Sequence, residues 1–358
     1  MQNIVVDAAG NIPKPLTIFE KKWRESVGSG DIKERMTELA ILQALPLSEK
    51  IALTETRIRC WHESFNGKVA VSFSGGKDSS VLLWLVRRLF PDVPAVFCNT
   101  GLEYPEVVKH VMSHDNVMVM RPKMPFRQVL EKYGFPLVSK KVARGISVLR
   151  NHTAANQNIY RLYDQGINRF GEQVNGFKVA DRWRFLVDAP FNCSDKCCQI
   201  MKKEPMTRYT KLTGYKSFVG TMATDSKARE KVYLQHGCNG YDMKDPKSMP
   251  LGFWKEQDVL QALVTYNIAY PTVYGRILRR DNGELYCTGV KRTGCVFCMF
   301  AMHMESAPNR FQKLYHSHPR LHSYCMDKLG LGDVIKYVRE NCPDKSVVQK
   351  FSNQITLF

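Results

Sequence analysis

Short apolar runs alternate with helix-length segments through the middle of the chain. Residues 69–73, 95–99 and 117–120 have the length and composition of buried strands, and an apolar helical segment follows each of them. Strands that alternate with helices in this way are typical of a parallel sheet. The pattern therefore predicts an α/β fold built on a doubly wound parallel sheet.

Helical spacing of apolar residues precedes the first of these runs, and a further strand follows much later in the chain. Helices are expected at residues 18–27, 32–45 and 47–65. The later strand is expected at residues 217–221, and residues 249–259 are expected to lead into another helix.

These elements divide the chain into three parts. Residues 1–66 are expected to form a helical N-terminal extension, and residues 67–300 an α/β domain with an insertion at about 143–192. Residues 301–358 are expected to form a helical C-terminal region.

The composition adds a strong positive charge to this picture. The 358 residues include 52 Lys and Arg against 34 Asp and Glu, a formal net charge of +18. Such a charge implies affinity for polyanions, which include nucleic acids and nucleotide substrates. Because the basic residues are spread along most of the chain, a well-solvated basic surface is the alternative interpretation.

The sequence gives no sign of export or membrane insertion. The first residues, MQNIVVDAAGNIPKPL, lack the basic start and apolar core of a signal peptide, and no apolar run has membrane-spanning length. We therefore expect a cytoplasmic protein without membrane contact. For eleven cysteines in that setting, metal or redox chemistry is favoured over disulfides. The sequence does not indicate an oligomeric state.

The most informative stretch is VAVSFSGGKDSS, which joins the first apolar run to a helix. Two glycines allow the backbone to turn tightly and direct its N–H groups at an anion, while Lys77 adds positive charge. Asp78, Ser79 and Ser80 are expected to cap the following helix, whose dipole favours phosphate. An ordinary strand-to-helix turn is the alternative. The expected phosphate-binding residues are Ser74, Gly75, Gly76, Lys77, Asp78, Ser79 and Ser80.

Two further loops are predicted to approach the same ligand. Asn99, Thr100, Gly101 and Glu103 follow the second expected strand, and the carboxyl ends of parallel strands share one edge of a sheet. Glu103 is expected to help hold a metal–phosphate complex or a ribose, with a solvated helix-start carboxylate as the alternative.

The other loop, residues 222–231, contains Ser226 and Arg229, which are expected to reach a phosphate.

The insertion mixes aromatic residues with arginines. Tyr160, Tyr163, Phe170, Trp183 and Phe185 are interleaved with basic side chains, a mixture that can stack bases and neutralise phosphates. Aromatic residues are more often part of a core, so we favour an irregular insertion that packs them inward.

The cysteines form two groups that are far apart in the sequence. Cys197 and Cys198 are adjacent, and Cys295 and Cys298 form a C-x-x-C pair that can hold zinc or iron. Adjacent cysteine side chains diverge, which favours separate irons of a cluster over one zinc ion. A zinc site and a metal-free set of buried thiols are the alternatives.

The loop sequence resembles the S-G-G-x-D-S loop of the PP-loop ATP pyrophosphatase superfamily. The Lys196-Cys197-Cys198 and Cys295-x2-Cys298 motifs, with the segment 250–259 between them, resemble the adenylylsulfate reductases, which carry a [4Fe–4S] cluster. The resemblance implies that Cys197, Cys198, Cys295 and Cys298 are cluster ligands. Cys193 lies close enough in the sequence to compete for that assignment.

One motif of those reductases is missing from the printed sequence. They use a cysteine in a C-terminal Glu-Cys-Gly-x-His segment, whereas Cys342 here lies in Asn-Cys-Pro. The sequence therefore resembles more closely the reductase-like sulfurtransferases, such as the DNA-phosphorothioation type.

The leading functional hypothesis is an adenylating, pyrophosphate-releasing enzyme that transfers sulfur to a nucleic-acid acceptor, DNA or tRNA. The resemblance implies ATP or adenylyl sulfate as ligand, with Mg²⁺, a [4Fe–4S] cluster and a sulfur-donor protein. Lys77, Asp78 and Arg229 are the expected catalytic residues. The second hypothesis is a sulfonucleotide reductase that uses Cys193, Cys238 or Cys287 as an atypical nucleophile. The third is a non-catalytic module that binds nucleotides or nucleic acid.

Overall fold

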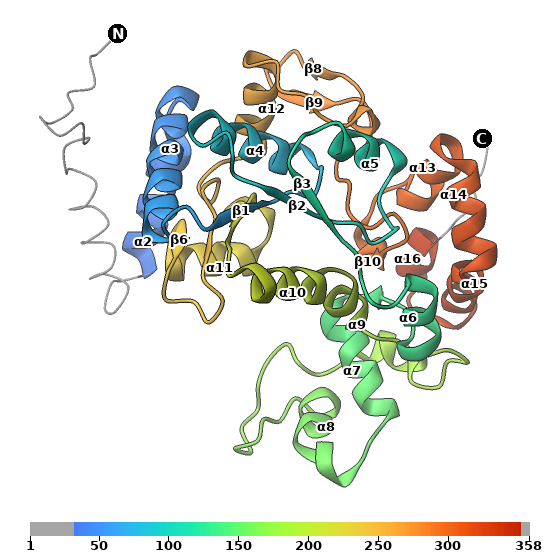
Figure 1. Ribbon diagram of the computed structural model, residues 1–358. Coiled ribbons are helices and arrows are strands. Elements are labelled where there is room, and N and C mark those ends of the chain that lie inside the picture. Colours follow the sequence, from blue (N-terminus) through green and yellow to red (C-terminus); the bar gives the residue numbers. More distant parts are fainter. Residues whose placement is uncertain (1–31, 352–358) are drawn as a thin grey trace, which may run out of the picture. The chain divides into compact units, whose positions relative to one another are not determined.

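The computed structural model describes residues 32–351, which form two compact units (Figure 1). The helix expected at residues 18–27 lies outside the described residues. The first unit contains residues 32–97, Glu106–Met118 and Thr210–Arg292. The second unit contains Cys98–Pro105, Val119–Tyr209 and residues 293–351. Each unit is therefore assembled from stretches that are separated in the sequence.

A six-stranded sheet runs in the order β3-β2-β1-β5-β7-β6. Strand β1 pairs in parallel with β2 and β5, and β5 pairs in parallel with β7. Val71 lies opposite Ala95 on one side and Phe218 on the other. The strands are β1 (Val69–Ser72), β2 (Ala95–Cys98), β3 (Val117–Met120), β5 (Lys216–Val219), β6 (Asn239–Gly240) and β7 (Lys247–Ser248). The prediction of a doubly wound parallel sheet is confirmed.

The edge of the sheet departs from the expectation. Strands β6 and β7 contain two residues each and pair in antiparallel fashion, with Asn239 opposite Ser248. The apolar-run criterion did not predict them because they contain no apolar residue. The expected strands at residues 95–99 and 217–221 end one and two residues earlier than predicted.

The helices of the first unit surround a core centred on the buried residues of β1. Val69, Val71 and Phe73 are almost completely buried, as are Leu82 of α4 and Trp254. Helix α4 contacts both α3 and α12. The helices are α2 (Ile32–Ala44), α3 (Leu47–Ser64), α4 (Lys77–Leu89), α5 (Pro105–Met112), α11 (Lys227–His236) and α12 (Glu256–Thr265), followed by the hairpin of β8 (Ile277–Arg279) and β9 (Leu285–Cys287). The start of α5 at its proline agrees with the preference for proline in a first turn.

A buried ion pair joins α3 to α12 within the first unit. The Nζ atom of Lys50 lies 2.7 Å from Oδ2 of Asp258 and also donates to the carbonyl oxygen of Gln43 at 2.9 Å. Lys50 is only 1% exposed. The same Asp258 oxygen accepts the backbone N–H of Lys255 at 2.7 Å, which caps the start of α12. One carboxylate therefore fixes both the position and the first turn of α12.

The second unit contains the insertion and the C-terminal helices. A two-stranded parallel sheet joins β4 (Leu137–Val138) to β10 (Met299–Phe300). The helices include α6 (Phe126–Tyr133), α7 (Lys140–Arg150), α8 (Gln157–Asp164), α9 (Lys196–Cys198), α10 (Glu204–Thr213), α13 (Arg310–Ser317), α14 (Pro319–Ser323), α15 (Leu331–Asn341) and α16 (Lys345–Val348). Between α9 and α10, Gln199–Lys203 adopts π-helical geometry.

The insertion is helical in part, not irregular as expected, because α7 and α8 occupy much of it. Its aromatic residues divide into two groups. Tyr163 and Trp183 are buried, so the core interpretation holds for them. Phe170 is 71% exposed, and the Arg169 guanidinium lies 4.6 Å from its ring centroid.

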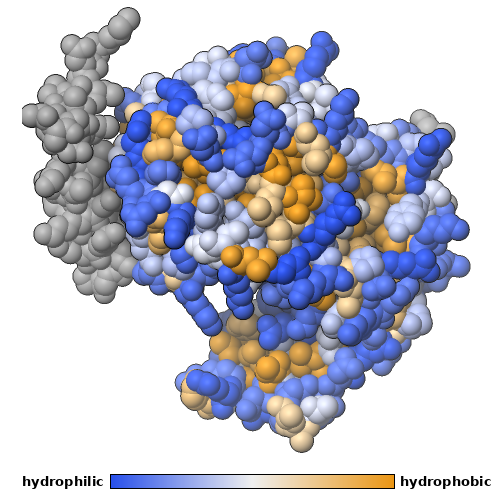
Figure 2. All heavy atoms as spheres, viewed as in Figure 1, coloured by the Kyte–Doolittle hydropathy of each residue, from blue (hydrophilic) through white to orange (hydrophobic). Residues whose placement is uncertain are grey.

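Hydrophilic residues cover much of the face shown in Figure 2, with apolar residues in patches between them. Across residues 32–351, no helix combines the length and the apolar character needed to cross a bilayer.

Candidate functional site

The turn between β1 and α4 requires glycine at position 75. Gly75 has a φ of 71°, a left-handed conformation that residues with a Cβ rarely adopt. A Cβ at this position would lie 2.5 Å from Cγ2 of Val111 and 2.8 Å from Cγ1 of Val107, both on α5. The close approach of α5 therefore fixes the backbone of the turn and the direction of its amide groups.

The helix cap at this turn differs from the prediction. Gly76 is the N-cap residue of α4, whereas Asp78, Ser79 and Ser80 lie inside the first turn. The hydroxyls of Ser79 and Ser80 donate to the Gly76 carbonyl oxygen at 2.9 and 3.1 Å, so they do not accept the N–H groups of the helix. The first-turn N–H groups of a helix have no intrahelical acceptor and carry the positive end of its dipole. This end of α4 is therefore suited to an anion.

Charged side chains gather around the start of α4. The Nζ atom of Lys77 lies 3.1 Å from Oδ1 of Asp78 and 3.4 Å from Oε1 of Glu256, and Lys77 is 4% exposed. Burial lowers the pKa of Lys77, but the nearby Asp78, Tyr274 and Glu256 groups raise it to a net value above the ordinary one.

The pKa of Asp78 is also raised, although a lysine is its partner. Burial is the largest cause, and the Asp225 and Glu256 carboxylates add to it, while Lys77 acts in the opposite direction. The pKa values of Lys77 and Asp78 can both rise because one ammonium group, that of Lys77, lies among three carboxylates. This cluster of Lys77, Asp78, Asp225 and Glu256 is called the acidic loop cluster below.

A tyrosine and a cysteine from the C-terminal part of the first unit also reach this site. The backbone N–H of Lys77 donates to the Tyr274 hydroxyl at 3.3 Å, and Nζ lies 5.8 Å from the Tyr274 ring centroid. Cys287, on β9, interacts electrostatically with Lys77, although burial raises the pKa of its thiol. Sequence reasoning missed Tyr274, Asp225 and Glu256. Asp225 lies in the loop at residues 222–231 and Glu256 in the segment 250–259, but neither carboxylate was assigned a role there.

Ser226 and Arg229 have local partners in the structure. Ser226 caps α11, and its hydroxyl accepts the backbone N–H of Arg229 at 3.3 Å. The Arg229 guanidinium forms an ion pair with Asp225. Arg229 is thus linked to the acidic loop cluster through Asp225, and its contact with a phosphate remains a prediction.

Replacing Gly75 by alanine is expected to lower the free energy of unfolding by about 2–4 kcal/mol, from the left-handed backbone and the clash with α5. Denaturant unfolding monitored by circular dichroism measures this loss. Gly283→Ala is the matched control, because Gly283 has a φ of 85° and no neighbouring atom lies within 4 Å of the position that its Cβ would take. An equal loss in both variants would contradict the role assigned to α5.

A histidine pair lies behind the turn. Nε2 of His110 lies 2.9 Å from the Ser80 hydroxyl, and the His110 and His114 rings are 4.6 Å apart. Burial, and to a lesser extent His114, lowers the pKa of His110 to about 4. His110 is therefore neutral in the folded protein at pH values where an unfolded histidine, with a pKa near 6.5, binds a proton.

This difference predicts acid sensitivity. As the pH falls from 6.5 to 4, the unfolded state binds a proton that the folded state excludes, so stability is lost in that window. His110→Gln is expected to lose about 2 kcal/mol less than the unmodified protein between pH 7 and 4.5. Urea unfolding at both pH values measures the difference. His316→Gln, at an exposed position, is the control, and an unchanged pH dependence in His110→Gln would refute the assignment.

The loop after β2 belongs to the second unit and is closed by its own side chains. Glu103 accepts the Thr100 hydroxyl at 2.7 Å, the Thr100 N–H at 3.1 Å and the Leu102 N–H at 3.2 Å. The Asn99 side-chain oxygen accepts the Gly101 N–H at 3.1 Å. Glu103 therefore stabilises its loop, and its contact with a metal–phosphate complex or a ribose remains a prediction.

Local structure explains how the second unit positions the two cysteine groups. Cys197 and Cys198 lie on α9. The turn between Cys295 and Cys298 is closed by a backbone hydrogen bond of 3.1 Å, and Val296 N–H donates to the Leu102 carbonyl at 2.8 Å. Directly after this turn, β10 pairs with β4, which precedes α7.

These four cysteines interact with one another. Cys197 donates a hydrogen bond to Cys198, which lowers the pKa of Cys198 and raises that of Cys197. The Cys295 and Cys298 thiols contribute to the same rise at Cys197. Lys140 is hydrogen-bonded to Cys198, and Lys202 to Cys295. Sequence reasoning assigned no role to either lysine. Within residues 32–351, no three or more His, Cys, Asp or Glu side chains are arranged to hold a single metal ion.

Other cysteines differ in their surroundings. Cys193 is 2% exposed, and burial raises its pKa to about 12, opposed by Arg150. Cys238 is buried beside Tyr233, with which it forms a hydrogen bond. Cys98 donates to the Met201 carbonyl at 3.1 Å and interacts with Cys295. Of the three cysteines considered as nucleophiles, Cys287 is the one that interacts with Lys77.

A parallel α/β sheet with an anion-binding turn between its first strand and the next helix defines a nucleotide-binding α/β protein. The sequence matches the phosphoadenosine phosphosulfate reductase domain over residues 68–141 and 158–301, and the chain belongs to that family. The predicted membership in this family, whose members bind adenine nucleotides, is confirmed.

Individual curated relatives are 25% to 35% identical to this chain over the residues that match. An uncharacterized protein of Methanocaldococcus jannaschii is 25% identical over 272 residues, which cover 74% of this chain and 48% of that protein. Sulfate adenylyltransferase subunit 2 of Shewanella sediminis is 25% identical over 226 residues, 56% of this chain and 58% of the relative. The chain spans about half the length of the curated relatives from Methanocaldococcus jannaschii that it matches.

Two reductases complete the comparison. The phosphoadenosine 5′-phosphosulfate reductase of Klebsiella pneumoniae is 35% identical over 86 residues, 21% of this chain and 35% of that protein. The crystal structure of a phosphoadenylyl-sulfate reductase from Candida auris, in complex with phosphate, has 14% identity and a TM-score of 0.35 and covers 68% of this chain and 91% of that one.

Proposed function

We propose that this protein uses ATP to adenylate an acceptor, releases pyrophosphate, and then replaces the activated oxygen with sulfur. The observation that carries the proposal is the acidic loop cluster at the N-terminus of α4. A helix N-terminus with a buried lysine favours phosphate, and the Asp78 carboxylate beside it can share a divalent cation with that phosphate. Together they match a metal-bound polyphosphate better than a simple anion.

The residues of the turn would act by electrostatics and alignment. The amide groups of the first turn and the Lys77 ammonium would neutralise the phosphates. Asp78 would provide one oxygen ligand to Mg²⁺, the other ligands being phosphate oxygens and water, and Mg²⁺ would neutralise the charge of the departing pyrophosphate. In this step an acceptor oxygen loses its proton and attacks the α-phosphorus, and the bond to the pyrophosphate oxygen breaks. In the following step a sulfur nucleophile would attack the atom that carries the activated oxygen, and AMP would leave with that oxygen. Arg229, paired with Asp225, would contact the phosphates at the edge of the site.

Cys197, Cys198, Cys295 and Cys298 would hold a [4Fe–4S] cluster. Four thiols that interact without converging on a single-ion site fit a group in which each iron takes one thiolate. Lys140 and Lys202 would offset the negative charge of the thiolates. When bound, the cluster would supply sulfide, or it would adjust the reduction potential at which the sulfur is transferred. Cys193 stays outside the proposed ligand set because burial and Arg150 account for its raised pKa, whereas the other three cysteines of the set act on the pKa of Cys197.

A nucleic acid, DNA or tRNA, is the proposed acceptor. The net charge of +18 would attract a polyanion of this kind and increase its rate of association. A sulfur-donor protein would supply the sulfur that the reaction consumes.

A sulfonucleotide reductase is the second candidate, and the position of Cys287 favours it. A thiol that interacts with Lys77 lies where the sulfur of adenylyl sulfate could be attacked. Its thiolate would form a bond to that sulfur while AMP leaves, and a thiol reductant would then release sulfite. Burial raises the pKa of Cys287, which opposes thiolate formation and places this candidate second.

The deciding experiment compares nucleotide products with protein purified without oxygen. One arm measures pyrophosphate from ATP and Mg²⁺, with and without DNA or tRNA, and the other measures sulfite from adenylyl sulfate and a thiol reductant. Nucleic-acid-stimulated pyrophosphate release is expected; sulfite release instead would favour the reductase, and neither product would favour a binding module. Iron and sulfide analysis of the same preparation tests the cluster, since colourless, zinc-loaded protein would exclude it.

A further inference from the structure

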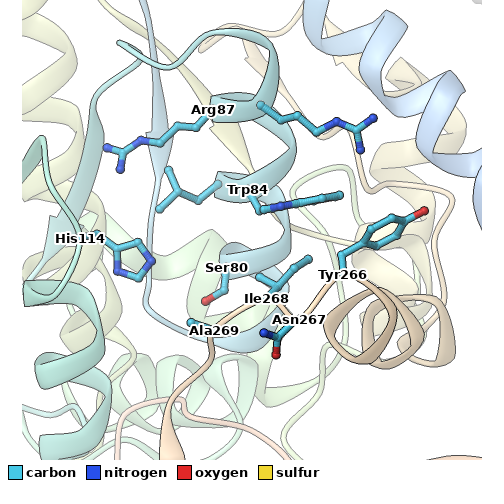
Figure 3. A pocket seen from close by; sticks show the side chains of 10 residues that line it. Ser80, Trp84, Arg87, His114, Tyr266, Asn267, Ile268 and Ala269 are labelled. Atoms are coloured by element: carbon cyan, nitrogen blue, oxygen red, sulfur yellow. The ribbon is translucent and has the colours of Figure 1, made fainter.

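A cavity of about 470 Å³ opens beside α4, beyond the anion-binding turn (Figure 3). Its lining comes from one face of α4, which includes Ser80, Trp84 and Arg87, and from the loop after α12, which includes Tyr266 and Asn267. All of these residues belong to the first unit. The volume falls in the range of small-molecule binding sites, about 300–1,000 Å³. The space is therefore large enough for a ligand such as a nucleotide.

One side of the cavity is aromatic. The Trp84 and Tyr266 rings have centroids 4.8 Å apart and are inclined at 31°. The Arg88 guanidinium lies 5.3 Å from the Trp84 ring centroid, so a flat cationic group already occupies space above this ring. Tyr266 is 38% exposed, so part of its ring is accessible. A flat heteroaromatic ring can stack on such a surface.

Positive charge lies next to these rings. Arg88 is held by one ion pair, 3.4 Å from Glu55, and its side chain is 48% exposed, so it can turn toward a ligand. Arg87 donates Nε to the Val93 carbonyl at 3.3 Å and Nη2 to the Asn116 carbonyl at 3.0 Å. These two bonds fix the guanidinium while leaving N–H groups on its outer side. A guanidinium fixed in this way is suited to phosphate recognition.

The remaining lining supports the same chemistry. His114 adds an imidazole on the side of Arg87, and the Asn267 amide offers both a donor and an acceptor (Figure 3). No acidic side chain of the described residues lines the cavity. The combination of a stacking surface, two arginines and an amide matches a base with its attached phosphate.

We propose that this cavity binds a nucleotide, with the base stacked on the accessible part of Trp84 or Tyr266 and the phosphate bound by Arg88. The nucleotide is either free or one residue of a single-stranded nucleic acid, since both present the same base and phosphate. The site is separate from the acidic loop cluster and does not depend on the reaction proposed for it. A purely structural interpretation accounts for the ring pair, but it leaves the open volume beside two arginines unexplained.

The test uses the full-length protein in a Lys77→Met background, which is expected to weaken nucleotide binding at the anion-binding turn. Two probes are compared: a fluorescently labelled single-stranded oligonucleotide, followed by anisotropy, and AMP, followed by equilibrium dialysis. Arg88→Glu and Trp84→Leu are the test variants. Arg127→Glu is the charge-matched control, because Arg127 is an exposed arginine of α6 with an ion pair to Glu131. Far-ultraviolet circular dichroism checks the fold of each variant.

Each test variant is expected to weaken binding of at least one probe by about tenfold, the loss of one stacked base or one phosphate contact. For the oligonucleotide, Arg88→Glu is also expected to reduce the slope of log affinity against log salt by about one.

Weakened binding of AMP identifies the ligand as a free nucleotide. Weakened binding of the oligonucleotide alone identifies it as one nucleotide of a single strand. Unchanged affinity for both probes, or an equal loss in Arg127→Glu, overturns the proposal. Because Arg88→Glu changes an exposed residue, it decides the question even where Trp84→Leu fails to fold. Pyrophosphate release from ATP is measured separately with Lys77 present, so failure here leaves the proposed function untouched.

Discussion

Replacing Lys77 by methionine is expected to reduce nucleotide turnover by about a hundred- to a thousandfold, the effect of removing one charge that stabilises a reacting phosphate. Methionine keeps the length of the side chain but loses the ammonium group that lies 3.1 Å from Asp78 and 3.4 Å from Glu256. Without it, Asp78 and Glu256 lose the ammonium group that they share, whereas Asp225 keeps its ion pair with Arg229. Pyrophosphate release from ATP, and sulfite release from adenylyl sulfate, are the two rates to measure.

The control for this variant is Lys227→Met. Lys227 lies in the same unit on α11, is almost fully exposed, and forms an ion pair with Glu230, so its loss removes the same charge from the surface. Its turnover is expected to stay within about twofold of the unmodified protein, because exposed ion pairs contribute little. If Lys77→Met retained full turnover with either substrate, the anion-binding turn would not be the reaction site.

Replacing Asp258 by leucine is expected to lower the free energy of unfolding by about 3–5 kcal/mol, the typical result of leaving a buried charge without its partner. Lys50 is 1% exposed and would retain only the Gln43 carbonyl oxygen as a neighbour. The start of α12 would also lose its cap, because the Lys255 N–H donates to the same Asp258 oxygen. Denaturant unfolding in the presence and absence of nucleotide measures the effect.

The double variant Lys50→Met, Asp258→Leu separates these two contributions. It removes both charges, so most of the lost stability is expected to return, since an apolar pair often replaces a buried ion pair without loss. A deficit of about 1 kcal/mol is expected to remain, because the cap of α12 is still missing. If the double variant were as unstable as Asp258→Leu, the unpaired lysine would not be the cause.

The central sheet was predictable because its strands are compact apolar runs. The strands at residues 69–73 and 117–120 could be predicted from their composition and from the helices between them. Strands β6 and β7 could not be predicted in this way, because Asn239–Gly240 and Lys247–Ser248 obtain their extended form from pairing with each other and with β5. Tertiary contacts determine such short strands, and local sequence carries no signal for them.

The sites were predictable where a motif concentrates the chemistry in a few adjacent residues. The turn at Ser74–Gly76 follows from a local motif, whereas the grouping of Cys197 with Cys295 followed from the resemblance to the adenylylsulfate reductases. Asp225, Glu256 and Tyr274 were missed, because each lies on a different element far along the chain and reaches Lys77 only through the fold. The capping prediction for Asp78, Ser79 and Ser80 was wrong, since α4 begins two residues earlier than that prediction required.

The pairing of β1 with β5 has a consequence for synthesis on the ribosome. Lys216, the first residue of β5, is made long after Ser72, the last residue of β1, and the intervening chain includes most of the second unit. At translation rates of roughly 5–20 residues per second, β1 waits about 7–30 seconds for this neighbour. During that interval an apolar strand that is buried in the folded protein has one unpaired edge, so a nascent chain stalled before residue 216 is expected to depend on chaperones to avoid aggregation.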